Sequence, residues 1–180
     1  MTALKSNNLY QLSVPVFLRY LNQLDELLSD MQLFAKQQGL SEAQLLAAKL
    51  ADDMFPLGQQ MSTAIGFSLR TCLPLAGRDI ENLSPEVISC QSLQQQLHSS
   101  VRCLQQLKAE QFEQSTPSNI STQAGFAKLS LSPSEYLQQY MLPNFFFHYT
   151  MSYAILRQHG MPLSKQNFDG YHQYPAGFSF

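Results

Sequence analysis

Hydrophobic positions recur every three or four residues along four stretches of the chain, the period of an α-helix that buries one face. In the first stretch these positions are Leu9, Leu12, Val16, Tyr20, Leu24, Leu27, Met31 and Phe34. Gly39 ends this helix, because glycine readily adopts the left-handed conformation that follows a helix. Pro15 lies early in the stretch, so the helix either begins with Ser13 as its N-cap or bends at the proline.

The second stretch opens with the capping-box sequence of residues 41–44 and is predicted to run to about Leu73. Pro56 interrupts it, because proline cannot donate a hydrogen bond to the carbonyl of Asp52. Two alternatives stay open. Either one helix kinks at Pro56, or a first short helix ends near Ala51 and Asp53 caps a new start.

Two serine–proline sequences predict the starts of the remaining helices. Residues 84–86, Ser-Pro-Glu, open a third helix that is expected to reach about Lys108. Residues 132–135, Ser-Pro-Ser-Glu, combine a capping box with proline and open a fourth helix, which Gly160 ends.

The segments outside these helices have a different character. Residues 116–130 break the helical period, and alternating pieces at 119–122 and 126–131 predict a small β-hairpin. The last twenty residues, 161–180, are predicted to form a loop. Aromatic side chains in such a tail pack on the flank of the bundle or on a partner. They are Phe168, Tyr171, Tyr174, Phe178 and Phe180.

Four helices with apolar stripes and mostly short connections predict an all-α fold, a four-helix bundle with a short β excursion before the fourth helix. A chain of 180 residues has the usual length of one domain. We therefore expect a single domain over residues 1–180, with a core at about 9–160 and a tail at 161–180.

The composition of the chain excludes several classes of function but does not identify one. Only 13% of residues are charged and the net charge is −2, while 22 glutamines supply much of the surface polarity. No basic block favours nucleic acid, and no apolar run is long enough to span a membrane or act as a signal peptide. An odd number of widely spaced cysteines predicts buried thiols in a reducing compartment, so a cytoplasmic location is expected. They are Cys72, Cys90 and Cys103.

One polar pair lies among the apolar positions of the fourth helix. Asn144 and His148 are four residues apart, so their side chains share the face that points into the bundle. Burying such groups without partners costs about 1–3 kcal/mol each, and the nearest candidate anions are Asp52 and Asp53. These four residues form the candidate ligand pocket.

The roles of these residues stay open at this point. His148 is structural, or takes part in ligand binding or catalysis without a metal, or is a metal ligand. Asp52 and Asp53 either cap a helix or belong to a site beside His148. A histidine near an aspartate has its charged form favoured and suits acid–base chemistry near neutral pH.

Two runs of sequence carry a resemblance to a known family: residues 142–148, Leu-Pro-Asn-Phe-Phe-Phe-His, and residues 51–57, Ala-Asp-Asp-Met-Phe-Pro-Leu. Residues 153–157, 163–165 and 168–170 add to it. Over about residues 9–170 the chain resembles a bacterial and fungal family known only as a domain of unknown function, number nineteen-ninety-three. That family belongs to the DinB/YfiT-like superfamily of four-helix bundles, and the resemblance implies a DinB-like bundle and a homodimer.

The same resemblance bears on metal binding. Better-studied DinB-like proteins hold a metal on three histidines, one on the second helix and two on the fourth as H-x-x-x-H. The resemblance places the fourth-helix positions at Asn144 and His148, so only one histidine is retained, and Asp52 or Asp53 is the nearest group on the second helix. This set lacks the three strong ligands of a catalytic zinc or nickel site. No cofactor is expected, and a divalent metal, if one binds, would use His148 with Asp53.

Two functions follow as hypotheses. In the first, the protein binds a ligand or a partner without a metal, and Asp53, Asn144 and His148 shape a pocket or fix the packing. The alternative is a metal-dependent thiol transferase or hydrolase of the DinB-like superfamily with a degenerate metal site. The missing histidines favour the first, and whether the protein is an enzyme stays open. The expected partners are a second copy and a small-molecule ligand, without nucleic acid or membrane.

Overall fold

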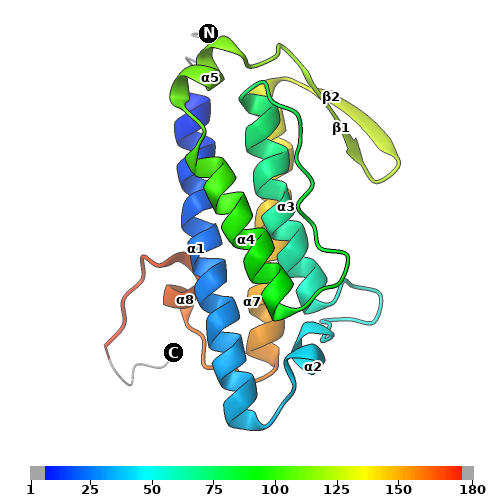
Figure 1. The fold of residues 1–180 in the computed structure, drawn as a ribbon, viewed down its shortest axis with the longest axis vertical. Coiled ribbons are helices and arrows are strands. Elements are labelled where there is room, and N and C mark those ends of the chain that lie inside the picture. The colour runs from blue at the N-terminus through cyan, green and yellow to red at the C-terminus, as the bar shows by residue number, and fades with distance from the viewer. Residues whose placement is uncertain (1–6, 176–180) are drawn as a thin grey trace.

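Four long helices form the body of the molecule, which a computed structural model describes over residues 7–175 (Figure 1). They are α1 (Asn7–Gln38), α3 (Leu57–Leu75), α4 (Cys90–Gln105) and α7 (Leu142–Gln158). The shorter elements are α2 (Glu42–Leu46), α5 (Ala109–Gln114), β1 (Ile120–Ala124), β2 (Ala127–Leu131), α6 (Pro133–Glu135), the π-helical turn η1 (Tyr136–Met141) and α8 (Lys165–Asp169). The predicted helical bundle with a short β excursion is confirmed.

The first helix begins earlier than Ser13 and continues through Pro15. Ser13 is therefore inside α1 and is not its N-cap. Its hydroxyl is fully buried and donates to the Leu9 carbonyl at 2.6 Å, so the helix itself satisfies this polar group.

The second stretch forms two helices, but the prediction that Asp53 caps the second one is wrong. The capping box at Ser41 opens the five-residue α2, as predicted. After an irregular segment, α3 begins at Leu57 with Pro56 in the N-cap position and without a side-chain cap. A helix capped by Asp53 would include Phe55, but the ring of Pro56 disfavours the helical conformation at the residue before it, so α3 starts only after the proline.

The third helix also begins later than predicted, at Cys90 instead of after Ser84. Ser89 and Ser92 cap it reciprocally: each backbone N–H donates to the other residue's hydroxyl oxygen, at 2.8 and 3.1 Å. Residues 76–89 therefore form a long irregular connection, which runs back alongside α3 to the start of α4 (Figure 1).

The hairpin and the start of the last helix follow the prediction. β1 and β2 pair antiparallel, with Ile120 opposite Leu131, and the turn contains Gly125 at a φ of +57°. The capping box of Ser132 and Glu135 is present. A π-helical turn then precedes Pro143, and the Leu142 N–H bonds to the carbonyl five residues back. In a regular α-helix the ring of Pro143 would clash with the carbonyl four residues back, and the wider π-helical turn makes room for it.

The tail is only partly a loop, because residues 165–169 form α8. Phe168 packs edge-on against Tyr149 and Tyr153, with ring centroids 5.0 and 5.6 Å apart, and Arg19 of α1 lies 3.7 Å from the ring centroid of Tyr171. These aromatics pack on the bundle's own flank, one of the two predicted alternatives. Phe178 and Phe180 lie outside the described residues.

Two further predictions concern the cysteines and the membrane. All three cysteines are free and buried, as expected. Within residues 7–175, no helix has both the length and the apolar character needed to cross a membrane.

Candidate functional site

His148 lies half-buried on α7 and faces α3. Its Nδ1 is 2.7 Å from Oε1 of Gln60, a buried residue of α3. The Gln60 amide nitrogen donates to the Phe55 carbonyl at 3.3 Å, which fixes the oxygen toward the histidine. Because an amide oxygen only accepts, Nδ1 carries the proton of the neutral ring.

Aromatic rings surround this histidine. The imidazole is stacked with Phe55 and Phe67, at centroid distances of 6.2 and 5.6 Å, and meets Phe147 edge-on at 5.2 Å. Burial and the nearby Arg70 guanidinium both lower the pKa of His148 below its ordinary value. The charged form is disfavoured, the opposite of the effect that an adjacent aspartate would have.

The other predicted site residues are not gathered around His148. Asp52 and Asp53 are exposed on the connection between α2 and α3, and no hydrogen bond or ion pair joins either carboxylate to the histidine within the described chain. Asn144 shares the helix, but its side-chain amide donates to the Tyr140 carbonyl at 2.6 Å. The structure therefore pairs His148 with Gln60, which the sequence analysis missed. The sequence feature that could have identified Gln60 is its position three residues after Leu57, which places a polar side chain on the inward face of α3.

The groups around His148 do not fit the metal site of the better-studied superfamily members. The Nδ1–H bond to Gln60 leaves Nε2 of His148 as the ring atom that could bind a metal, but Asp52 and Asp53 are exposed on the connection between α2 and α3 and give it no second ligand. The part of the chain that the structure describes contains no group of three or more His, Cys, Asp or Glu side chains placed to hold a metal ion. The described residues around His148 therefore lack the three strong ligands of a catalytic zinc or nickel site.

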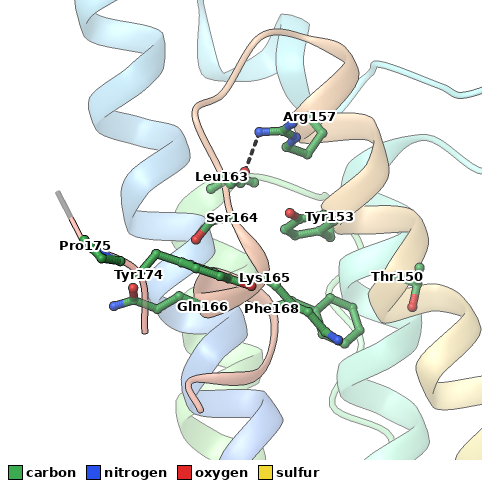
Figure 2. A pocket seen from close by; sticks show the side chains of 10 residues that line it. All are labelled: Thr150, Tyr153, Arg157, Leu163, Ser164, Lys165, Gln166, Phe168, Tyr174 and Pro175. Atoms are coloured by element: carbon green, nitrogen blue, oxygen red, sulfur yellow. Dashed lines mark hydrogen bonds between the residues drawn. The ribbon is translucent and has the colours of Figure 1, made fainter. Parts of the chain in front are cut away.

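A second feature is a hollow of about 760 Å³ between the C-terminal half of α7 and the tail (Figure 2). One wall is α7, and the other is the segment that leads into and through α8. The lining residues are Thr150, Tyr153, Arg157, Leu163, Ser164, Lys165, Gln166, Phe168, Tyr174 and Pro175.

The hollow combines cations with aromatic rings and has no acidic lining residue. Arg157 donates to the Leu163 carbonyl, which ties the start of the tail to α7 (Figure 2). The Lys165 ammonium makes no hydrogen bond or ion pair with any described residue, so its charge is available. Tyr153 and Phe168 meet at a right angle and supply the apolar surface.

Asp169 holds the tail in the shape that closes this hollow. One carboxylate oxygen accepts the backbone N–H groups of Tyr171 and His172 at 2.8 and 3.1 Å, and the other lies 2.6 Å from the His172 ring nitrogen. Burial alone would raise the pKa of this carboxyl, but these hydrogen bonds outweigh burial and hold it below the ordinary value. The sequence analysis noted the aromatics of the tail and missed this carboxylate and the two cations.

The comparisons with known proteins agree with the resemblance seen in the sequence. The model of a family described as "Domain of unknown function (DUF1993)" matches residues 9–169. No curated protein matches the chain. Among solved structures, the chain is similar to a DinB family member protein from Shewanella denitrificans, with a TM-score of 0.83 and 25% sequence identity. The match covers 95% of this chain and 97% of that chain.

Proposed function

Because the chain belongs to the DUF1993 family and has the fold of a DinB family member, we propose that it is a small-molecule-binding protein that works without a metal. The observation that carries the proposal is the hollow between α7 and α8, where Lys165, whose ammonium has no partner among the described residues, lies beside aromatic walls (Figure 2). The ligand class that fits is a flat aromatic molecule with an anionic group.

Size and charge both support this ligand class. A volume of about 760 Å³ falls in the range of roughly 300–1,000 Å³ that is usual for small-molecule pockets. The protein as a whole is slightly acidic, yet two cations and no carboxylate line the hollow. An anion is therefore drawn to this place on the surface, and the rings of Tyr153 and Phe168 bind its apolar part.

His148 has a structural role in this proposal. Its hydrogen bond with Gln60 joins α7 to α3, the helices that carry much of the core, and its lowered pKa keeps it neutral at physiological pH. Nothing in the described part of the chain favours the metal-dependent transferase or hydrolase.

The superfamily resemblance also supports a homodimer as part of the proposal, and the free, buried thiols support a cytoplasmic location. Phe55 and Phe147, which flank His148, are each 51% exposed and give an apolar surface that a second copy can cover. Analytical ultracentrifugation of the full chain distinguishes a monomer from a dimer. A monomer at all concentrations would remove the dimer from the proposal.

The proposal is tested by titration with 1-anilinonaphthalene-8-sulfonate in the presence of EDTA. We expect one-site binding, weakened about tenfold by Lys165→Glu because the change replaces an attraction by a repulsion. The matched control is Lys128→Glu on β2, away from α8 (Figure 1). Equal binding by both variants, or binding that requires a divalent metal, would overturn the proposal.

A further inference from the structure

A smaller cavity lies on another side of the bundle, between α3 and α4. Its volume is about 290 Å³. The long connection between the two helices covers it with residues 80–84, as expected from the path of that segment along α3 (Figure 1). None of its lining residues belongs to the hollow between α7 and α8.

Two buried polar side chains of α4 line this cavity without satisfied hydrogen bonds. The Gln96 amide nitrogen donates to the Ser62 carbonyl at 3.1 Å, but its Oε1 has no partner, and the Ser100 hydroxyl has none at all. The two residues are 3% and 0% exposed. Within residues 9–175 they supply the only buried side-chain nitrogen or oxygen atoms that lack a hydrogen-bond partner.

Both groups lower the stability of the protein, since a buried polar atom without a partner loses its bonds to water and gains nothing in return. They are four residues apart, so they lie one above the other on the same face of α4. Side chains that cost stability and converge on a cavity are characteristic of binding sites.

The wall of the cavity that α3 forms contributes the cation Arg70 and, at Gly66, unoccupied space. The Arg70 guanidinium lies 4.7 Å from the centroid of the Phe67 ring and makes no hydrogen bond or ion pair with any described side chain. Glu81 also lines the cavity, but its carboxylate is paired with Arg78 at 2.9 Å. At Gly66, in the middle of α3, an added Cβ would meet nothing within 4 Å, so helix packing does not require glycine there.

We propose that this cavity is a second binding site, for a small carboxylate that also carries a hydroxyl or amino group. The carboxylate pairs with Arg70, whose planar fork matches two oxygens. The hydroxyl or amino group donates to Gln96 Oε1, and the Ser100 hydroxyl donates or accepts as the ligand requires. A volume near the lower limit of small-molecule pockets restricts the ligand to a few carbon atoms.

The test measures the melting temperature of the full chain with L-malate, D-glycerate or L-serine. Acetate, which lacks the donor, and glycerol, which lacks the carboxylate, are the controls. At ten times its dissociation constant, a probe that binds the folded state raises the melting temperature by about 3–6 °C. If no probe shifts the melting temperature beyond the controls, the assignment is wrong.

Two variants connect the shift to the cavity. Ser100→Ala and Gln96→Met each remove an unpartnered oxygen, so we expect both to lose the ligand-induced shift. Ser100→Ala breaks no hydrogen bond, so its unliganded melting temperature is equal to or above that of the wild type, whereas Gln96→Met also removes the bond to the Ser62 carbonyl. Ser99→Ala, at the neighbouring position of α4 and outside the cavity lining, is the matched control and keeps the shift. A shift that survives both cavity variants would overturn the proposal, and so would a marked loss of unliganded stability in Ser100→Ala.

Gly66→Ala gives an independent measurement. The added methyl group enters the open space, so the helix gains stability while the cavity loses volume, and the ligand-induced shift decreases. Lys165→Glu, the variant that tests the other hollow, leaves the carboxylate shift unchanged. The two proposals can therefore fail separately.

Discussion

Replacing His148 by phenylalanine removes the hydrogen bond to Gln60 but keeps a flat ring between Phe55 and Phe67. The bond is 2.7 Å long, and Gln60 is 1% exposed, so its Oε1 loses the only donor that it has among residues 7–175. An unsatisfied buried acceptor costs about 1–3 kcal/mol of unfolding free energy. For a chain of this size, each kcal/mol corresponds to a fall of about 2–4 °C in melting temperature.

A double-mutant cycle separates the hydrogen bond from the effects of side-chain shape. Gln60→Leu leaves the histidine without its acceptor, and the double variant replaces both partners by apolar groups of similar size. We expect the double variant to lose less than the sum of the single losses, by about 0.5–1.5 kcal/mol in urea unfolding at pH 8. Additive losses would show that the two side chains do not interact and would refute the structural role of His148.

The pH dependence of stability gives a second readout of the same residue. The pKa of His148 is lowered in the folded protein, so the unfolded chain binds a proton at a higher pH than the folded one. The contribution of this residue is complete above the ordinary histidine pKa and is lost as the pH falls through the lower folded value. Wild type therefore loses more stability between pH 7 and pH 5 than His148→Phe does, and parallel curves would contradict this reasoning.

Three other predictions test the tail, a turn and the cysteines. Asp169→Asn weakens the hydrogen bonds that hold the tail, so limited proteolysis at neutral pH cleaves residues 161–175 faster than in the wild type. The wild type becomes equally sensitive only at a pH below the ordinary aspartate pKa, where its own carboxylate is protonated. Gly77→Ala places a Cβ 2.6 Å from the Ser115 carbonyl oxygen, whereas Gly39→Ala, at the same φ of +67°, meets open space. Urea unfolding then shows a loss of about 1 kcal/mol for Gly39→Ala and at least about twice that for Gly77→Ala. The three buried thiols, whose pKa values burial raises, react with a disulfide reagent at pH 8 only after the chain unfolds.

The parts of the fold that the sequence predicted correctly depend on interactions between near neighbours. The capping boxes that begin at Ser41 and Ser132 involve bonds between residues three apart, and the hairpin is closed by a short turn at Gly125. The start of α4 was wrong because two serine signals competed. Ser89 prevailed over Ser84, and residues 80–84 instead cover the cavity between α3 and α4.

The candidate site was harder to predict because its partners are far apart in sequence. The interior position of His148 followed from its helix face, but its partner Gln60 is 88 residues away and depends on how α3 and α7 align. Arg157 and Lys165 look like ordinary surface residues in the sequence. They line a common hollow only because Asp169 and Phe168 fold the tail back against α7.

The most direct test of the proposed function is a crystal structure of the protein with bound 1-anilinonaphthalene-8-sulfonate. The proposal predicts its aromatic rings against Tyr153 and Phe168, with the sulfonate beside Lys165. Density for the probe on Phe55 and Phe147 beside His148, with nothing bound between α7 and α8, would contradict it.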